Sequence, residues 1–433
     1  MLIQPRTLKG FRDSSPKIQS LRNKIWHAAR RVAHQSGFQE IATPALEYAE
    51  TLIGQAGGET EKQTYVFKDH GEREVGLRFD LTIPFARYVA ENYGKLIFPL
   101  RRLQIGEVWR GENTQKGRYR EFCQCDFDIV GSDSEASDIE VISNLAKILD
   151  VLEFGAFTIQ LNSRPLLTGI LKNFYKEKFD EAKEQKALIA LDKLGKNSPE
   201  QVAALLDQIF EVPSLEFIHL LAGSDLNKIA ELLDEKSSEH LKRFLKTFEI
   251  LKQFFSFQNV TYKLNFSIAR GLGYYDGIVF ETTIDAVPTF GSICSGGRYN
   301  NLINRFSKEN IPGVGGSIGV DRLVAYLEDL PPLDSTSETT ILVAYTHGDV
   351  LDYACEILSE LKKNHISSEL GLQNKIAHQF RHADRLKIPY VVTVGPDEKT
   401  NRTANFKNML TQTEEKSLPF EKLITITKKI LKE

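Results

Sequence analysis

The chain has 433 residues, of which 41% are hydrophobic and 26% charged, a mixture typical of globular proteins with two or three domains. This mixture excludes a disordered, fibrous or disulfide-stabilised small protein. The 58 acidic and 55 basic side chains nearly balance, so the formal net charge is only -3 and any nucleic-acid site must be a local cluster of positive charge.

The cysteines and the hydropathy pattern indicate the compartment. Four cysteines are too few for a disulfide scaffold, and none shows the C-x-x-C spacing of a zinc site: Cys123, Cys125, Cys294 and Cys355. No run approaches the roughly 18 apolar residues that a membrane span needs, and the N-terminus lacks the apolar core of a signal peptide. We expect reduced thiols, no metal held by the protein itself, no membrane association and a cytoplasmic location.

The N-terminal segment is strongly basic. Its first 31 residues hold eight basic side chains, opposed only by Asp13: Arg6, Lys9, Arg12, Lys17, Arg22, Lys24, Arg30 and Arg31. The Ser15-Pro16 pair favours a helix start and Gly37 a helix end, so we predict a helix between them. Its basic strip either faces phosphates or carboxylates or is an ordinary solvated helix face.

A long hairpin is predicted next, because residues 96–110 and 120–130 alternate like strands and the segment between them is rich in turn residues. Residues 101–120 include six basic side chains, whose guanidinium forks could clamp a polyphosphate. Alternation along the second strand places a mixed set on one face: Arg118, Arg120, Phe122, Gln124, Asp126 and Asp128. A solvated outer face would alternate in the same way, so this pattern alone does not identify a site.

The middle of the chain combines a sheet with a helical insertion. Ser137 and Glu140 have the spacing of a capping box, which predicts a helix that opens there, followed by a strand over 156–162. Residues 166–255 have helical spacing almost throughout, and strand patterns return after them. We therefore expect one domain over 1–330, interrupted by a helical insertion over 166–255.

A segment rich in Pro, Ser, Thr and acidic residues at 331–339 is typical of a linker. Beyond it, strands and helices alternate, which predicts a mixed-sheet α/β domain over 340–433. The expected fold class is thus α/β of the α+β kind, with one sheet in each of two domains.

Two glycine-rich motifs stand out in the first domain. ARGLGYYDG (269–277) combines Arg270 with glycines and two tyrosines, so backbone and aromatic hydroxyls could approach a ligand there, although a plain turn is an equally fair interpretation. PGVGGSIGVDR (312–322) matches neither the dinucleotide fingerprint nor the P-loop. It forms either a nucleotide platform that delivers Arg322 or a tight contact between a strand and a helix.

Taken in order, these segments resemble the class II aminoacyl-tRNA synthetases. GFQEIATPALE (37–47) is similar to motif 1, the dimer-interface motif, VWRGENTQKGRYREF (108–122) to motif 2, and GVGGSIGVDRL (313–323) to motif 3. Further segments resemble signatures of the histidyl-tRNA synthetase family: LRFDLT (77–82), QCDFD (124–128), ARGLGYYDG and SGGRYNNL (295–302). The resemblance implies an antiparallel-sheet catalytic core, a helical insertion, a C-terminal anticodon-binding domain and a homodimer.

The resemblance also implies a histidine–tRNA ligase. Such an enzyme activates L-histidine with ATP to histidyl-adenylate and then transfers histidine to the 3′-terminal ribose of histidine tRNA. Arg110 and Arg270 would be catalytic, on opposite sides of the α-phosphate, and no covalent nucleophile is needed. Mg²⁺ would bridge the phosphates. The ATP-binding residues would be Arg110, Glu112, Arg118, Phe122 and Arg322.

The same resemblance assigns the remaining ligands. Those of histidine would be Asp80, Thr82, Arg110, Gln124, Asp128, Arg270, Tyr274 and Tyr275, with Asp128 and Tyr275 at the imidazole. Buried polar partners of this kind reject side chains that cannot pair with them. The tRNA would be contacted by Gln115 at its acceptor end and, in the anticodon-binding domain, by Lys375, Arg381 and Arg385.

The chain departs from the usual family pattern at Gly273 and Asn300, where acidic residues are common. Two other functions stay open. One is a regulatory paralogue that partners ATP phosphoribosyltransferase, keeps the histidine site without aminoacylation and lacks the anticodon-binding domain. The other is a module that only binds RNA or acts in signalling, for which this set of residues would be unexplained: Arg110, Glu112, Arg270 and Arg322.

Overall fold

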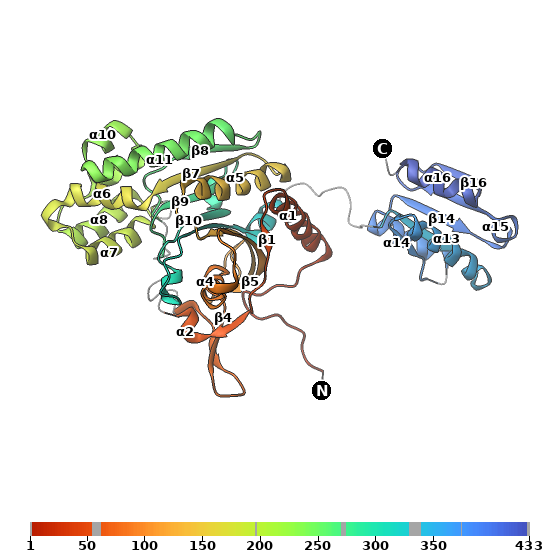
Figure 1. Cartoon of the computed structure of the whole chain (residues 1–433). Coiled ribbons are helices and arrows are strands. Elements are labelled where there is room, and N and C mark those ends of the chain that lie inside the picture. Colours follow the sequence, from red (N-terminus) through yellow and green to blue (C-terminus); the bar gives the residue numbers. More distant parts are fainter. Residues whose placement is uncertain are drawn as a thin grey trace. The chain divides into compact units, whose positions relative to one another are not determined.

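The chain divides into two compact units, Met1–Asp329 and Leu330–Glu433 (Figure 1). The computed structural model describes residues 2–53, 62–194, 197–269, 274–328, 339–373 and 375–430. Each unit has its own main sheet and its own hydrophobic core, and the predicted α/β fold class is confirmed. The first unit also contains a small three-stranded sheet, so the expectation of one sheet in each domain is wrong for it. Of the predicted linker, only Thr339 belongs to the described residues.

An eight-stranded sheet organises the first unit. Its strands, in spatial order, are β1 (Gln39–Glu40), β5 (Leu100–Trp109), β6 (Glu121–Val130), β11 (Gly313–Gly319), β10 (Cys294–Arg298), β9 (Ile278–Ile284), β7 (Phe157–Ser163) and β8 (Val260–Leu264). Neighbours are antiparallel except β1 with β5 and β7 with β8. The predicted antiparallel core is therefore present, with a parallel strand added at each edge, and β5 and β6 form the predicted hairpin.

Helices pack against this sheet and against one another: α1 (Pro16–Gln35), α5 (Glu135–Leu152) and α12 (Val320–Leu327). α1 follows the prediction, since the Ser15 hydroxyl caps it by accepting the N–H of Ile18. The prediction that α5 opens at Ser137 is wrong. Ser134 is its N-cap, because an extended backbone lets the Ser134 hydroxyl accept the N–H of Ala136, and Ser137 falls inside the first turn.

Alternate positions of β6 serve two different surroundings. Cys125, Phe127 and Ile129 are buried in the main core together with Ile25 of α1 and Leu145 of α5. The even-numbered positions from Phe122 to Asp128 line a cleft on the opposite face of the sheet. The hairpin therefore connects the core directly to the cleft.

Helices fill the chain between β7 and β8: α6 (Arg164–Tyr175), a 3₁₀ turn (Lys176–Lys178), α7 (Glu181–Leu191), α8 (Pro199–Phe210), α9 (Leu215–Gly223), α10 (Leu226–Glu231) and α11 (Glu235–Phe254). They gather beside the β7–β8 end of the sheet (Figure 1). Leu206, Phe217 and other buried side chains of these helices belong to the same hydrophobic core as the sheet. Within the described residues, the helical segment thus shares that core and does not form a separate one.

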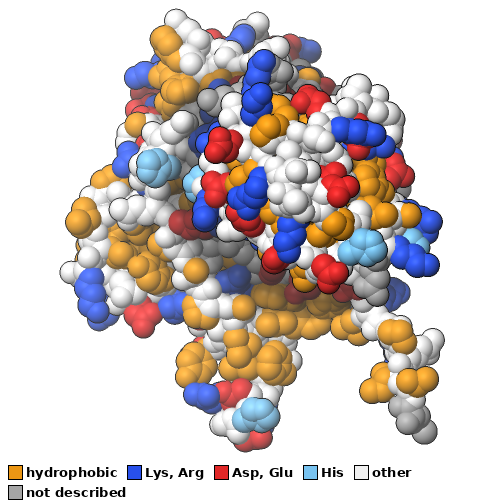
Figure 2. Space-filling view, turned by 90° about the vertical axis from the view of Figure 1, so that its right-hand side faces the viewer, with side chains coloured by type: hydrophobic (Ala, Val, Ile, Leu, Met, Phe, Trp, Pro, Cys, Tyr) orange, Lys and Arg blue, Asp and Glu red, His pale blue; other side chains and the backbone are white. Residues whose placement is uncertain are grey.

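A small sheet has the strand order β2-β4-β3 and is accompanied by two helices and a 3₁₀ turn. Its strands are β2 (Leu46–Tyr48), β3 (Val66–Lys68) and β4 (Glu74–Leu77), and the helical elements are α2 (Ala49–Leu52), α4 (Thr82–Glu91) and the turn Tyr93–Lys95. Leu46, Tyr48, Val66 and Phe67 are between 41% and 52% exposed. Figure 2 shows hydrophobic side chains grouped on the projecting β3–β4 hairpin above a charged tip. An exposed apolar patch of this kind is typical of a contact with another protein.

Two further 3₁₀ turns flank β10, at Pro288–Phe290 and Ile303–Arg305. The second unit is built on a five-stranded mixed sheet: β13 (Ser368–Leu370), β12 (Ile341–Tyr345), β14 (Tyr390–Val394), β15 (Thr403–Asn408) and β16 (Glu414–Pro419), in this spatial order. Its helical elements are a 3₁₀ turn (Gly348–Val350), α13 (Leu351–Lys363), α14 (Ile376–Leu386), α15 (Pro396–Asn401) and α16 (Phe420–Ile430).

The central strand β12 of this second sheet is buried on both faces, as its parallel pairing with β13 and β14 predicts. Ile341 and Val343 of β12 pack in one cluster with α13 and α16, whereas Leu342 and Ala344 pack in another with α14. The predicted alternation of strands and helices after residue 340 is confirmed.

Candidate active site

A cleft of about 1100 Å³ opens over the eight-stranded sheet, on the face opposite the core side of β6. It brings together all but one of the site residues predicted within the first unit: Asp80, Thr82, Arg110, Glu112, Gln115, Arg118, Phe122, Gln124, Asp128, Tyr274, Tyr275 and Arg322. The alternation along β6 therefore marks the floor of a cleft and not a solvated outer face.

Asp80 and Gln124 present acceptor oxygens to this cleft. The Oδ1 of Asp80 accepts the N–H of Ile83 at 2.9 Å at the start of α4, whereas no described residue donates to its Oδ2. The Nε2 of Gln124 donates to the Oγ of Ser317 at 2.9 Å, and its Oε1 has no donor among the described residues. A buried acceptor without a donor is unfavourable, so these two oxygens fit the N–H donors of a ligand ammonium group.

Asp128 is held by a buried cluster that the sequence reasoning missed. Its Oδ1 accepts the hydroxyl of Tyr299 at 2.5 Å, and its Oδ2 pairs with Arg102. Arg102 is completely buried and also donates to the carbonyl of Leu81 at 2.9 Å and to Gln104 Oε1 at 2.6 Å. The Asp128 carboxylate is thus fixed in orientation at the floor of the cleft, where an imidazole N–H could still reach its remaining lone pairs.

The glycines of β11 make this arrangement possible. A Cβ at Gly315 would lie 1.9 Å from Asp128 Oδ1, so only glycine leaves room for the carboxylate. On the other face, a Cβ at Gly316 would lie 2.5 Å from Leu145 of α5. The glycines of β11 therefore allow the strand to pack tightly against a helix, which is one of the two interpretations that the sequence left open for this motif. It also leads to Arg322, which lines the cleft as the other interpretation requires.

Arg110 lies at the mouth of the hairpin. Its Nε donates to the carbonyl of Phe79 at 3.1 Å, and its guanidinium carbon lies 4.3 Å from the centre of the Phe79 ring and 5.0 Å from that of Phe122. Burial lowers the pKa of Arg110, and the carboxylates of Asp80 and Glu112 oppose that shift. An arginine remains charged at any physiological pH, so this desolvated guanidinium would be stabilised by a bound anion.

Two more arginines extend this positive wall. Arg118 pairs with Glu112 at 3.2 Å, and the Nη1 of Arg322 donates to the carbonyl of Ser292 at 2.6 Å. Burial also lowers the pKa of Arg322. The guanidinium groups of Arg110, Arg118 and Arg322 line one cleft and fit a polyphosphate with an attached ring.

Arg101 and Arg102 of the hairpin do not form part of a phosphate clamp, because Arg101 binds Glu140 and Arg102 binds Asp128, so that interpretation is wrong for these two residues. Arg101 points to the helix side and binds Glu140 of α5 at 2.9 Å. The expectation that Arg120 shares the cleft face is also wrong. Strand β6 begins only at Glu121, and the Arg120 Nε donates to the backbone carbonyl of Glu112.

The basic strip at the N-terminus faces carboxylates of the protein itself. Arg30 of α1 binds Glu40 through two hydrogen bonds of 2.9 Å on the surface. Arg12 and Arg22 instead reach Asp321 of α12, at 3.2 and 2.6 Å. Of the open interpretations of this strip, the carboxylate-facing one therefore holds for these arginines.

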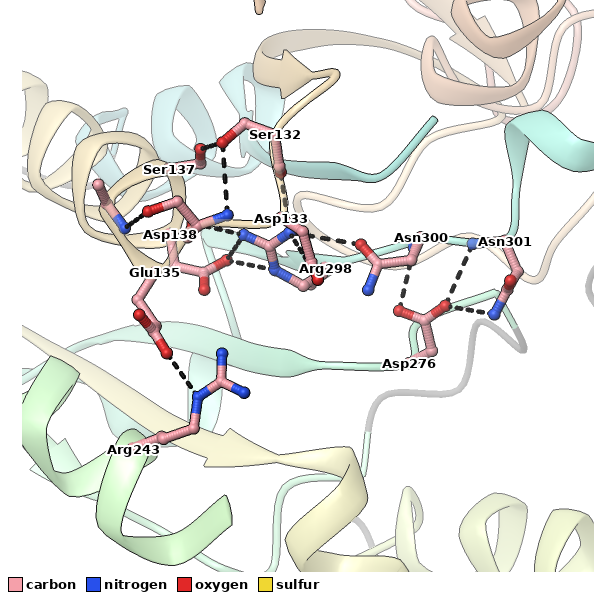
Figure 3. Close-up of polar contacts among 12 residues, drawn as sticks. Ser132, Asp133, Glu135, Ser137, Asp138, Arg243, Asp276, Arg298, Asn300 and Asn301 are labelled. Atoms are coloured by element: carbon pink, nitrogen blue, oxygen red, sulfur yellow. Dashed lines mark hydrogen bonds and ion pairs between the residues drawn. The ribbon is translucent and has the colours of Figure 1, made fainter. Parts of the chain in front are cut away.

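Arg298, from the SGGRYNNL motif, connects the loop before α5 with Asn300 (Figure 3). It binds Asp138 of α5 at 2.8 Å and the carbonyl of Ser134 at 3.0 Å. Asp276 accepts the N–H of Asn300 at 3.0 Å, and the Asn300 amide oxygen accepts from Arg298 at 3.3 Å. A carboxylate could make that last contact equally well, so the departure from aspartate at Asn300 preserves it.

Some predicted residues are not in this cleft. Arg270 and Gly273 lie outside the described residues. Lys375, Arg381 and Arg385 belong to the second unit, where they are exposed at and along α14. Arg381 and Arg385 are one turn apart and share a helix face, as neighbouring phosphates would require.

Because Asp126 is a buried carboxyl group on the floor of the cleft, we expect the stability of the protein to depend on pH. It is 2% exposed, and burial raises its pKa to about 7, which Arg102 at 3.7 Å only partly offsets. The unfolded pKa is about 4, so the folded protein holds a proton that the unfolded chain has lost between these values. Stability should therefore fall as the pH rises from about 4 through about 7.

The Asp126→Asn variant should show a shallower fall, because it removes this titrating group and keeps the shape of the side chain. Urea denaturation of both proteins at several values between about pH 5 and 8 measures the difference. Parallel pH profiles for wild type and variant would contradict the assignment.

The cleft offers acceptors for an ammonium group and guanidinium groups for phosphates, so it is suited to joining an amino acid to a nucleotide. An antiparallel sheet with such a hairpin, and a glycine strand leading into the helix of Arg322, is the catalytic core of the class II aminoacyl-tRNA synthetases.

Comparisons with known proteins give the family. A family model described as histidyl-tRNA synthetase matches residues 10–323, and one described as anticodon binding domain matches residues 340–430. A histidine–tRNA ligase of Helicobacter pylori is 38% identical over 438 residues, with 98% of each chain covered. That of Wolinella succinogenes is 40% identical over 424 residues, with 94% of each covered. The chain therefore belongs to the histidyl-tRNA synthetase family.

Solved structures agree with this assignment. The crystal structure of histidyl-tRNA synthetase from Nostoc sp. PCC 7120 has a TM-score of 0.83 at 26% identity, covering 99% of this chain and all of that one. A structure described as an ATP phosphoribosyltransferase regulatory subunit/histidyl-tRNA synthetase from Bacillus halodurans C has a TM-score of 0.71 at 19% identity, covering 91% of this chain and 99% of that one. The second likeness shows a shared fold alone.

Proposed function

We propose that the chain is a histidine–tRNA ligase. The observation that carries the proposal is that one cleft holds acceptor oxygens of Asp80 and Gln124 to which no described residue donates, a fixed carboxylate at Asp128 and the guanidinium of Arg110. These are the groups needed to bind an amino acid beside ATP. Membership of the histidyl-tRNA synthetase family supports the same function.

In the first step, a carboxylate oxygen of histidine attacks the α-phosphorus of ATP. The P–O bond to the leaving group breaks, and the products are histidyl-adenylate and pyrophosphate. Arg110 would bind the α-phosphate and the carboxylate, and Arg270 would neutralise the charge from the other side. Fixed positive charge stabilises the transition state without reorganisation at the moment of reaction.

ATP would be held by the remaining guanidinium groups and rings. Arg118 would reach the outer phosphates, Phe122 and Arg322 would enclose the adenine, and Glu112 would accept from its amino group. Mg²⁺ would arrive with the phosphates of ATP and would neutralise part of their charge.

Histidine would be recognised at both ends. Asp80, Thr82 and Gln124 would hold its α-ammonium group and carboxylate. Asp128 with Tyr275 would bracket the imidazole nitrogens beside Tyr274. Because Asp128 is oriented by Tyr299 and Arg102, a side chain without matching N–H groups would leave buried polar atoms unpaired. Such a site discriminates strongly without a separate editing step.

In the second step, the 3′-terminal ribose hydroxyl of histidine tRNA attacks the carbonyl of histidyl-adenylate and releases AMP. Gln115, which lines the outer part of the cleft, would contact the acceptor end. Lys375, Arg381 and Arg385 would contact the RNA from the second unit, which matches the anticodon-binding family over 340–430.

The assembly proposed for the chain is a homodimer in the cytoplasm. The apolar patch of Leu46, Tyr48, Val66 and Phe67 includes one residue of the segment that resembles motif 1, Leu46. Burial of this patch by a second copy would remove it from water. No helix in the described part of the chain is long and apolar enough to cross a membrane.

Purified protein is expected to exchange pyrophosphate into ATP when histidine is present, and not with the other amino acids. Histidine binding without exchange, by a folded protein, would favour the regulatory paralogue. The match over 340–430 argues against that alternative, because the paralogue lacks an anticodon-binding domain.

A further inference from the structure

The N-terminal segment contacts both walls of the proposed nucleotide site. We define the N-terminal strap as residues 8–22, which include a turn and the start of α1. Its contacts converge on Asp321, a side chain with 2% exposure on the first turn of α12. Asp321 directly precedes Arg322, which lines the cleft.

Asp321 connects two walls of the cleft through its two oxygens. Its Oδ1 accepts from Arg22 at 2.6 Å and from Arg12 at 3.2 Å. Its Oδ2 accepts the backbone N–H of Cys123 at 2.7 Å. Cys123 lies on β6 between Phe122 and Gln124, both of which line the cleft. One buried carboxylate therefore fixes the strand that carries Phe122 relative to the helix that carries Arg322.

The strap also holds the return of the hairpin loop. Arg12 donates to the Tyr119 hydroxyl at 3.0 Å, and its guanidinium carbon lies 4.2 Å from the centre of that ring. The carbonyl of Gly10 accepts the backbone N–H of Arg120 at 2.8 Å. Gly10 has a φ of +88°, and a Cβ there would lie 2.8 Å from the Arg120 side chain, so only glycine allows this close approach.

The two arginines of the strap neutralise several carboxylates together. Arg22 also binds Glu107 at 3.1 Å, and Arg12 binds Glu328 at 3.1 Å. Removing one arginine would leave buried carboxylate charge around Asp321 poorly compensated, and the carboxylate would be free to release the Cys123 backbone. The strap thus acts on the cleft through Asp321 and does not itself line the cleft.

We propose that Arg12, Arg22 and Asp321 are positioning residues that set the spacing of the two walls of the ATP site. This inference rests on the proposed function, in which Phe122 and Arg322 enclose the adenine. Asp128, at the imidazole end of the histidine site, is held separately by Arg102 and Tyr299. Loss of the strap contacts should therefore weaken ATP binding more than histidine binding.

The test compares Arg22→Ala with Arg30→Ala, since both remove an arginine–carboxylate pair from α1 but only Arg22 reaches Asp321. In Arg22→Ala we expect the KM for ATP in pyrophosphate exchange to rise about tenfold, because charge-assisted hydrogen bonds are lost, with a change below about threefold for histidine. Arg30→Ala should leave both constants unchanged, and Arg22→Lys should recover part of the loss.

Gly10→Ala provides a second variant that leaves the buried charges intact and should raise the KM for ATP more modestly. Equal KM values for ATP in wild type, Arg22→Ala and Gly10→Ala would overturn the inference, as would equal rises for ATP and histidine. Calorimetric titration with ATP alone measures ATP binding directly, so it tests the inference even if the wild type shows no exchange. Absence of exchange in the wild type would count against the proposed function and not against the positioning role.

Discussion

Replacing Arg110 with alanine is expected to lower the rate of histidine-dependent ATP–pyrophosphate exchange by about 100- to 1000-fold, the usual effect of removing a fixed transition-state donor. Arg110 is oriented in advance by the Phe79 carbonyl and by the rings of Phe79 and Phe122. Its charge would therefore act on the α-phosphate without reorganisation. Exchange assays at saturating ATP and histidine measure the fall in kcat.

Arg101→Ala is the matched control. Arg101 belongs to the same hairpin, but its guanidinium binds Glu140 on the helix side, so its loss should leave the exchange rate nearly unchanged. Arg110→Lys keeps a positive charge and loses the two-pronged geometry, so it should recover only part of the activity. If the exchange rate of Arg110→Ala fell by less than tenfold, a catalytic role of Arg110 would be contradicted.

Replacing Arg102 with methionine is expected to lower the free energy of unfolding by about 3–5 kcal/mol, a large part of the roughly 5–15 kcal/mol available to a folded domain. Arg102 is completely buried and is the cation beside both Asp126 and Asp128. Without it, two carboxylates would remain in the interior close to one another. Urea denaturation followed by tryptophan fluorescence measures the loss, since Trp26 and Trp109 both lie in the first unit.

Two comparisons make this second experiment specific to the buried charges. The loss should be smaller at about pH 5.5 than at about pH 8, because burial raises the pKa of Asp126 to about 7 and protonation then relieves the repulsion. Burial also raises the pKa of Asp128 above its ordinary value, which acts in the same direction. Arg101→Met removes a partly exposed ion pair and should cost about 1 kcal/mol or less. Equal losses for the two variants at both pH values would contradict a special role for Arg102.

Much of the fold and part of the site could be predicted from the sequence, because the decisive patterns are local. The alternation of β6 and the turn residues before it define the hairpin, and the capping serine of α1 defines a helix start. Such local patterns could not predict whether Ser134 or Ser137 caps α5. Both are serines near a helix start, and only the backbone conformation separates them.

The residues that support the site could not be predicted from the sequence, because they depend on contacts between distant segments. Arg102 and Arg101 are neighbours in sequence, yet the pairing of Arg102 with Asp128 across the hairpin places one in the site and the other against α5. Tyr299 is 171 positions from Asp128, and Arg12 is 309 positions from Asp321. No spacing rule reports such pairs, which arise only when the sheet brings its strands together.

Charging of histidine tRNA by the whole chain is the direct test of the proposed ligase activity. With ATP, Mg²⁺ and labelled histidine, we expect the label to become attached to histidine tRNA, whereas other labelled amino acids should not be attached. A folded protein that binds histidine but leaves the tRNA uncharged would rule out the ligase activity and favour a regulatory, non-catalytic role.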